Sequence, residues 1–353
     1  MQAHAVRLGI RETFQDAAKE MAWHHGVTVS KEQVRRKTER AGAVYAQEQT
    51  QAPGAAMCVS PIPERQMLSV DGAMVHVTTG EWREVKTLTV AVVQPDASSQ
   101  APSYFSRMAE YHAFADQAQA EATRRQVKRS PAACAVADGA DYNQAVIDQL
   151  CPAAERILDF YHAAEHLALP LRAVYGEETD AFAAHFQQQR RELRDGDPDR
   201  VLATLSDLTA QHPVHAQIVN DTLGYFTKRR EQIHYAAFKA DGWPIGSGSG
   251  EAAHKVVVEP RLKKAGMRWA EVNVNPMLAL RNLSCNDRWE EGWPTIVAHL
   301  RHPRQPATPI VSDRDQVPTG TLPPGFALKP AVSWRKMPVG SAQRLPSSAH
   351  AKI

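Results

Sequence analysis

The sequence predicts a mixed α/β fold that carries a helical insertion and follows a small helical segment. Two apolar, β-branched runs, 66–78 and 84–94, flank the tetrapeptide TGEW and predict a β-hairpin. Residues 101–108 fit a third strand. Two later apolar runs, 132–140 and 155–159, predict short buried strands, and the second continues into a helix. From about 160 to 240 the periodicity is helical, with loops at YGEETD and DGDPD.

Composition sets outer limits on function. The 353 residues suffice for two or three domains, and 43% hydrophobic with 23% charged residues is typical of soluble globular proteins. A formal net charge of +2 does not by itself indicate a nucleic-acid binder, but it allows a local basic face. The four cysteines are far apart and form no C-x-x-C pair, which predicts reduced thiols in a cytosolic protein. No apolar run reaches roughly 18 residues, so no membrane span is expected.

The N-terminal segment has the pattern of a helix pair. Residues 12–42 predict two short helices joined by a tight turn at Gly26, and Ser30 with Gln33 forms a capping box that begins the second helix. This second helix carries the basic residues Lys31, Arg35, Arg36, Lys37 and Arg40. A helix-turn-helix places such a helix in the DNA major groove. An ordinary basic amphipathic helix pair has the same pattern.

Composition also divides the chain into segments. We expect a helix-turn-helix-like DNA-binding segment at 1–50, a Pro/Gly/Ala linker at 51–65 and one α/β domain at 66–301, with its helical insertion at about 165–240. The tail, 302–353, has nine prolines in 52 residues and is predicted to be disordered.

Three acidic residues are candidates for one site. Two predicted strands end in the same tripeptide, Asp-Gly-Ala, at Asp71 and Asp138. Asp-Gly alone is a common turn signal, but two neighbouring strands that end this way bring both carboxylates to one end of a sheet. Glu251 follows the stretch GWPIGSGSG at an apparent helix start, where an acid also serves as a cap or complements the helix dipole.

Carboxylates that converge in one cleft repel one another unless a cation lies between them. Mg²⁺ or Mn²⁺ suits a sparse Asp/Asp/Glu set, because these ions accept a few carboxylates together with water and phosphate oxygens. Two such ions can hold the attacking and leaving oxygens of a phosphodiester. The acids therefore predict phosphoryl-transfer chemistry.

The segment LDFYHAAEHL contains a further set of polar side chains. Asp159 and His162 are spaced i, i+3 and can meet on one helical turn, and Glu165 and His166 follow on the next turn. A zinc site is possible but lacks a distant third ligand. A structural Asp–His hydrogen bond at the end of the strand is the preferred interpretation.

Five segments together resemble the DDE transposases of bacterial insertion sequences, in particular the ISKra group. They are the two Asp-Gly-Ala tripeptides, LDFYHAAEHL, PIGSGSGE and RLKKAGMRW…LALRNL…RW, in the order of the family and within residues 12–300. The resemblance implies an RNase H-like mixed sheet with a helical insertion between the second Asp and the Glu. It also implies metal-dependent cleavage at transposon ends, followed by attack of the 3′-OH on target DNA.

The resemblance further implies roles for individual residues. Asp71, Asp138 and Glu251 would be the catalytic and metal-binding triad for Mg²⁺ or Mn²⁺, with two ions, and Asp159 and His162 would match the family's D-x-x-H signature in a supporting role. PIGSGSGE would return the chain from the insertion and direct Glu251 into the cluster, because glycine permits close backbone approach. The implied partners are double-stranded DNA, as transposon ends and target, and further copies of the chain.

Basic residues that follow Glu251 are expected to contact the DNA backbone together with Arg35 and Arg36. They are His254, Lys255, Arg261, Lys263, Lys264 and Arg268. A solvated helix face has the same composition. Trp269 is expected to pack in the core rather than to stack on a DNA base.

Two alternatives stay open. The short N-terminal region and the Pro-rich tail depart from the family pattern, which fits a decayed or truncated copy that binds DNA without catalysis. A metal-dependent nuclease of the same fold would cleave DNA without joining it. In each case we expect a bacterial cytoplasmic protein, associated with the nucleoid when bound to DNA.

Overall fold

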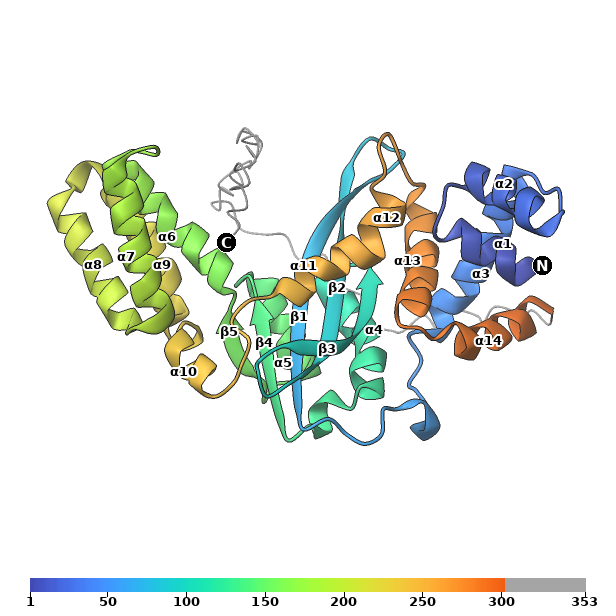
Figure 1. Cartoon of the computed structure of the whole chain (residues 1–353), viewed down its shortest axis with the longest axis horizontal. Coiled ribbons are helices and arrows are strands. Elements are labelled where there is room, and N and C mark those ends of the chain that lie inside the picture. Colours follow the sequence, from blue (N-terminus) through green and yellow to red (C-terminus); the bar gives the residue numbers. More distant parts are fainter. Residues whose placement is uncertain (302–353) are drawn as a thin grey trace, which may run out of the picture. The chain divides into compact units, whose positions relative to one another are not determined.

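A central five-stranded mixed sheet has helices on both faces, as the computed structural model shows (Figure 1). The structure describes residues 1–301, apart from the side chains of Ala55, Ser249, Gly250 and Glu251. The expectation of a disordered tail at 302–353 lies outside the described residues. Within residues 1–301, the predicted α/β class is confirmed.

The strands follow the sequence-based expectation closely. They are β1 (Arg65–His76), β2 (Trp82–Val93), β3 (Ser99–Arg107), β4 (Ala132–Ala137) and β5 (Glu155–Leu158). Their order in the sheet is β3-β2-β1-β4-β5. The first three strands pair antiparallel, whereas β4 pairs parallel with β1, and β5 with β4. The predicted hairpin and third strand are therefore confirmed.

Side-chain alternation along β1 separates the two faces of the sheet. Leu68 and Val70 point to one face, where they pack in a core with helices α4 (Tyr111–Arg124) and α5 (Asp141–Leu150). The odd-numbered residues of β1 point to the other face. Met67 packs there against the helical insertion, and further along the strand Ala73, Val75 and Val77 pack under the C-terminal helices.

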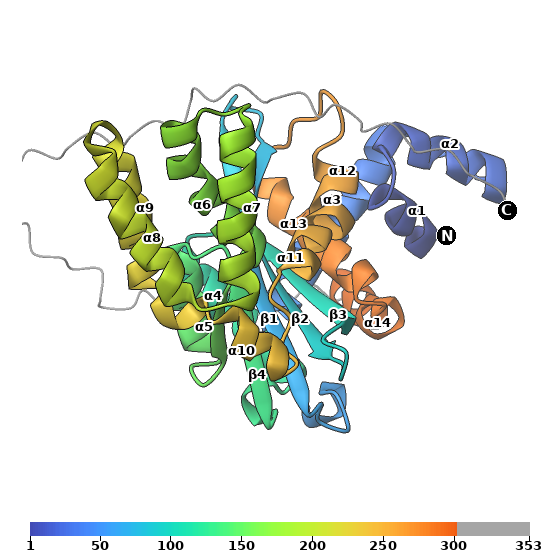
Figure 2. The ribbon, with the colours of Figure 1, turned by 60° about the vertical axis from the view of Figure 1, so that its left-hand side comes forward.

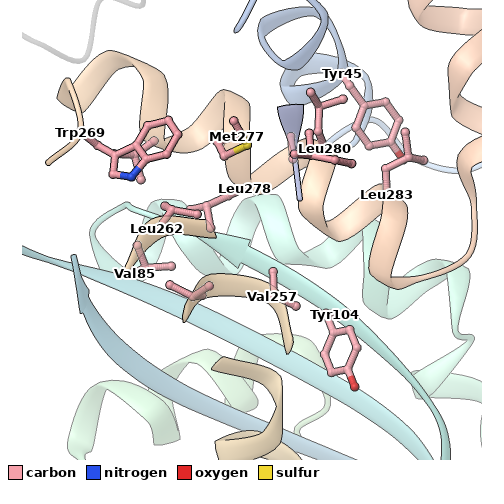
Figure 3. Close-up of a cluster of buried hydrophobic side chains, with 14 of the residues drawn as sticks. Tyr45, Val85, Tyr104, Val257, Leu262, Trp269, Met277, Leu278, Leu280 and Leu283 are labelled. Atoms are coloured by element: carbon pink, nitrogen blue, oxygen red, sulfur yellow. The ribbon is translucent and has the colours of Figure 1, made fainter. Parts of the chain in front are cut away.

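Helices α11 (Gly248–Ala253), α12 (Glu259–Leu262) and α13 (Glu271–Cys285) cover the second face over β1, β2 and β3. The last helix, α14 (Trp289–Arg301), packs on α3 and α13. A π-helical turn, His254–Val258, joins α11 to α12. Figure 3 shows the resulting core, in which Val85 and Tyr104 of the sheet meet Val257, Leu262 and Leu278.

The predicted insertion is a bundle of helices between β5 and α11 (Figure 2). It consists of α6 (Phe160–Tyr175), α7 (Asp180–Asp195), α8 (Pro198–Gln211), α9 (Ala216–Lys228) and the short α10 (Tyr235–Ala240). Phe160, Leu167, Leu193, Leu205 and Phe226 contribute to a core that continues onto the sheet face of β4 and β5. The insertion thus begins directly at the end of β5.

Three N-terminal helices form a small bundle: α1 (Gln2–Gly9), α2 (Phe14–His25) and α3 (Lys31–Glu48). Gly26 ends α2 with a φ of 62°, and Ser30 and Gln33 make both hydrogen bonds of the predicted capping box. Helix α1 was not expected from the sequence, because its eight residues make only about two helical turns, too short a window for the apolar pattern to stand out.

The N-terminal bundle and the sheet belong to one compact unit. Helix α3 packs on α13, where Gly42 lies against the backbone of Pro276 so closely that a Cβ would collide with it. Two buried guanidinium groups complete this junction. Arg261 Nε donates to the Gly9 carbonyl at 2.9 Å, and Arg281 Nη1 donates to the Ile10 carbonyl at 3.3 Å.

Two smaller expectations can be compared with the structure. All four cysteines are free thiols, and Cys134 and Cys151 are buried. In the described part of the chain, no helix is both long and apolar enough to span a bilayer.

We predict that Arg261→Met destabilises the protein by about 1–3 kcal/mol, because the Gly9 carbonyl then loses its donor in a buried place. The control is Arg268→Met, the same chemical change at an exposed position seven residues away, which should change the free energy of unfolding by no more than about 0.5 kcal/mol. Denaturant unfolding of both variants measures the difference. Equal costs would show that Arg261 does not stabilise the junction with α1.

Candidate active site

Asp71 lies inside β1, which continues to His76, whereas Asp138 directly follows β4, which ends at Ala137. The expectation that both Asp-Gly-Ala tripeptides end a strand is therefore wrong for Asp71, because β1 continues to pair with β2 beyond it. The β1–β4 ladder pairs Arg65 with Ala132 and ends at Leu68 with Ala135, a constant offset of 67. Asp71 and Asp138 have the same offset, three residues beyond the last pair. Asp71 has the same side-chain direction as Met67, which faces the insertion, and both aspartates lie beyond the same end of the β1–β4 ladder.

Asp71 is partly buried and lies against a histidine. Its Oδ1 accepts the Gly72 N–H at 2.7 Å, and its Oδ2 lies 3.3 Å from His254 Nε2. The alignment of this second contact is not that of a hydrogen bond, and neither ring nitrogen of the buried His254 has a hydrogen-bond partner among the described residues. Burial opposes ionisation of Asp71, but the His254 ring and the Gly72 N–H outweigh it and lower the pKa of the carboxyl. Asp71 is therefore an anion at neutral pH.

Asp138 sits in a tight turn between β4 and α5. Its Oδ1 accepts the Ala140 N–H at 3.0 Å and the Asn143 side-chain amide at 2.7 Å. Gly139 has a φ of 83°, and a Cβ there would lie 2.7 Å from Arg229 Nε and 2.8 Å from Tyr225 Oη. The second Asp-Gly-Ala tripeptide is thus a turn, as the common interpretation of Asp-Gly predicts, and this turn also orients a carboxylate.

Helix α9 of the insertion holds the Asp138 turn from outside. Tyr225 Oη donates to the Asp138 carbonyl at 3.1 Å, and Arg229 Nε donates to the Gly139 carbonyl at 3.2 Å. Lys228 forms an ion pair of 2.8 Å with Asp141. Insertion and turn therefore form one hydrogen-bonded unit.

Asp159 joins the two ends of the insertion. It is buried, and its Oδ1 accepts the N–H groups of Tyr161 and His162 at 2.7 and 2.9 Å, which caps α6. Its Oδ2 accepts the N–H of Ser247, in the segment that returns to α11. Next to this bond, the Phe160 N–H donates to the Ile245 carbonyl at 2.9 Å.

Asp159 and His162 are hydrogen-bonded as predicted, but not through the His162 side chain. The hydrogen bond uses the backbone N–H of His162, whereas the His162 ring points to Glu165, at 3.8 Å. An N-cap aspartate satisfies backbone donors first, because these lie nearest to it at the start of a helix. Asp159 and His162 thus meet through the main chain.

Glu251 belongs to helix α11, and the structure describes its main chain but not its side chain. Helix α11 contacts β1 and β2, and His254, three residues after Glu251, reaches Asp71. A spacing of three residues is close to one helical turn. The chain thus brings position 251 to the sheet face that carries Asp71.

The donor set fits a hard divalent cation. Asp71 and Asp138 each use Oδ1 for hydrogen bonds that orient the carboxylate, and no hydrogen bond to either Oδ2 occurs among the described residues. Oxygen ligands from two or three carboxylates suit Mg²⁺ or Mn²⁺. Within the described side chains, which exclude Glu251, no group of three or more His, Cys, Asp or Glu residues forms a complete metal site.

The structure corrects the predicted DNA contact of Arg261. Arg261 is 1% exposed, and its guanidinium lies 4.5 Å from the Phe14 ring and 4.7 Å from the Trp269 ring. A basic residue in the sequence does not reveal which side of a short helix it occupies, and this one points inward. Trp269 is buried beside it, as expected.

Apart from His254, the other predicted DNA contacts lie at the surface to different extents. Arg35 forms ion pairs with Glu32 and Glu39, whereas Arg36 is 68% exposed. The remaining predicted contacts are exposed or partly exposed: Lys255, Lys263, Lys264 and Arg268.

Two residues at the site, Tyr225 and Arg229, were not predicted, because their contacts with the Asp138 turn span 87 and 90 residues of the chain and leave no local signal. His254 was expected to contact DNA with the basic residues after Glu251, whereas its buried ring lies beside Asp71.

The sequence was also compared with models of protein families and with curated proteins, and neither comparison gives a match.

We predict that Gly139→Ala destabilises the protein by about 1–3 kcal/mol, because it combines a positive φ with contacts shorter than 3 Å. The control is Gly224→Ala in α9, where a Cβ meets nothing within 4 Å and alanine should stabilise the helix by up to about 1 kcal/mol. Thermal unfolding gives both values. Similar melting temperatures for the two variants would show that the turn tolerates a side chain.

A further prediction concerns Asp159. Asp159→Ala should accelerate amide hydrogen exchange at Ser247 and in α11, because the returning segment loses its acceptor. The control is Asp197→Ala, which removes the exposed N-cap of α8. It should lower the free energy of unfolding by about 1 kcal/mol without changing hydrogen exchange at Ser247. Unchanged exchange in Asp159→Ala would contradict the role of this carboxylate in joining the two ends.

Proposed function

We propose that this chain is a DDE transposase of an insertion sequence, with an RNase H-like core that cleaves transposon ends and joins them to target DNA. One observation carries the proposal: Asp71 and Asp138 lie beyond the same end of the parallel β1–β4 ladder, and α11 brings position 251 to the sheet face that carries Asp71. The mixed sheet in the order β3-β2-β1-β4-β5 is compatible with the RNase H-like core. The proposed partners are double-stranded DNA and further copies of the chain.

The arrangement suits phosphoryl transfer, which depends mainly on positioning and on neutralisation of charge. Asp71 and Asp138 present one carboxylate oxygen each, and hydrogen bonds to their other oxygens fix the orientation. When bound, two Mg²⁺ or Mn²⁺ ions would neutralise the phosphate charge and activate the attacking oxygen. Glu251 is proposed as the third ligand.

The N-terminal bundle supports the DNA-binding part of the proposal. Gln33, Arg36, Arg40, Ala43 and Gln47 are exposed at spacings of three and four, so they form one stripe along α3. The opposite side of α3 packs on α1, α2 and α13. A helix that exposes such a stripe and follows a short turn is suited to the DNA major groove.

The alternative is a decayed copy that binds DNA without catalysis. All three acids are retained, which favours the enzyme, and Asp71 is held as an anion. The alternative differs from the enzyme in one measurable property, since it would bind DNA without a functional metal site.

We predict that Asp71→Asn and Asp138→Asn each reduce cleavage and joining of DNA by at least about a hundredfold in Mg²⁺ or Mn²⁺, because each removes a charged ligand. The control is Asp96→Asn, a change in the exposed turn between β2 and β3, which should retain activity. DNA binding, measured separately, should persist in all three variants.

A second readout separates the enzyme from the decayed copy. Mn²⁺ at roughly a hundredfold above its dissociation constant should raise the free energy of unfolding of the wild type by about 2.7 kcal/mol. The increase should be smaller in Asp71→Asn and in Asp138→Asn. Equal melting with and without metal, together with retained DNA binding, would favour the decayed copy. Cleavage without joining would instead favour a nuclease.

A further inference from the structure

The β1–β2 hairpin extends beyond the predicted active site and carries an exposed aromatic pair. His76 and Trp82 face each other across the two strands, with ring centroids 4.8 Å apart and an interplanar angle of 9°. Trp82 is nevertheless 57% exposed. Since His76 covers one face of the indole, the exposed area belongs to the other face and the edges. The exposed indole face is therefore open to a flat ligand.

A pocket of about 360 Å³ lies beside this pair. It is lined by His76 and Trp82 and by the loop that follows α12, which includes Lys263, Lys264 and Arg268. The loop is joined to the hairpin by main-chain hydrogen bonds, Trp269 N–H to His76 O at 3.0 Å and Thr78 N–H to Trp269 O at 2.9 Å. Aromatic pair and basic loop are therefore held together as one rigid surface.

The charges of this surface are available to an anion. Lys263 and Lys264 form ion pairs with Glu259 and Glu12 at 3.2 and 3.6 Å, which are weak where solvent reaches them. Arg268 is exposed, and no ion pair with a carboxylate occurs for it within residues 1–301. The surface thus combines an open aromatic face with neighbouring cations.

This combination matches unpaired nucleic acid. Proteins that bind single strands use aromatic side chains on which bases stack, beside cations that follow the phosphates. Every base has a flat face, so this recognition does not depend on sequence. In a paired duplex, by contrast, both faces of a base are already stacked within the helix.

His76 lies five residues after Asp71 in β1, which corresponds to roughly 17 Å at the rise of a strand. Because this spacing is odd, the two side chains point to opposite faces of the sheet. The aromatic pair is therefore a surface separate from the three acids.

We propose that Trp82, backed by His76, is a stacking platform for an unpaired nucleotide of the DNA substrate, and that Arg268 and Lys264 bind the adjacent phosphates. This inference rests on the proposed function, because it takes DNA as the partner, and it adds a binding site outside the three acids. It assigns the enzyme a preference for DNA ends that carry unpaired nucleotides.

The test compares two labelled DNAs by fluorescence anisotropy, with the full chain and without divalent metal. One is a short duplex of mixed sequence, and the other is the same duplex with a single-stranded thymidine extension. The wild type should bind the extended DNA more tightly. Trp82→Ala should reduce this preference by about tenfold, and Trp82→Phe should retain most of it.

The matched control is Trp23→Ala, which removes a tryptophan that is 85% exposed on α2. Any effect of Trp23 on duplex binding changes both affinities alike and leaves the preference intact. Arg268→Ala gives an independent readout, because loss of one phosphate contact should lower the slope of log affinity against log salt by about one for the extended DNA.

The outcomes separate this inference from the proposed function. Equal binding of both DNAs by the wild type, or an unchanged preference in Trp82→Ala, overturns the platform while the transposase proposal stands. Failure to bind either DNA overturns both. A lost preference in Trp82→Ala with intact duplex binding supports the platform.

Discussion

The buried carboxylate of Asp159 is the interaction on which the arrangement of the predicted site depends. It caps the first helix of the insertion and also accepts an N–H from the segment that leaves the insertion. A bundle of five helices is therefore closed at its base by one side chain. Because α11 follows directly after Ser247, the place where position 251 meets the sheet is set by this closure.

The insertion also acts on the second aspartate. Tyr225 and Arg229 bind the carbonyls of Asp138 and Gly139, in the turn that positions the Asp138 carboxylate. Hydrogen bonds in a partly buried site with few competing waters are stronger than those at an open surface. The helical bundle is therefore part of the support of the site, and a movement of α9 would move Asp138 with it.

The N-terminal bundle is attached to the sheet domain through buried polar contacts. Arg261 and Arg281 satisfy the carbonyls at the end of α1, and burial lowers the pKa of Arg261 to about 10. The guanidinium between Phe14 and Trp269 combines hydrogen bonding with cation–π contact. The N-terminal bundle is consequently joined to the sheet domain by buried side chains as well as by the chain itself.

Local chemistry determined much of the secondary structure. Alternating apolar residues around TGEW produce the hairpin, and Gly26 and the Ser30–Gln33 capping box bound the helices, because these signals act over a few residues. The sequence also marked Asp71, Asp138 and Asp159 as unusual. Tertiary structure alone decided the common offset of Asp71 and Asp138, the inward direction of Arg261 and the contact of Tyr225 with the Asp138 turn. These depend on strand register and on contacts between residues far apart in the chain, and neither leaves a local pattern in the sequence.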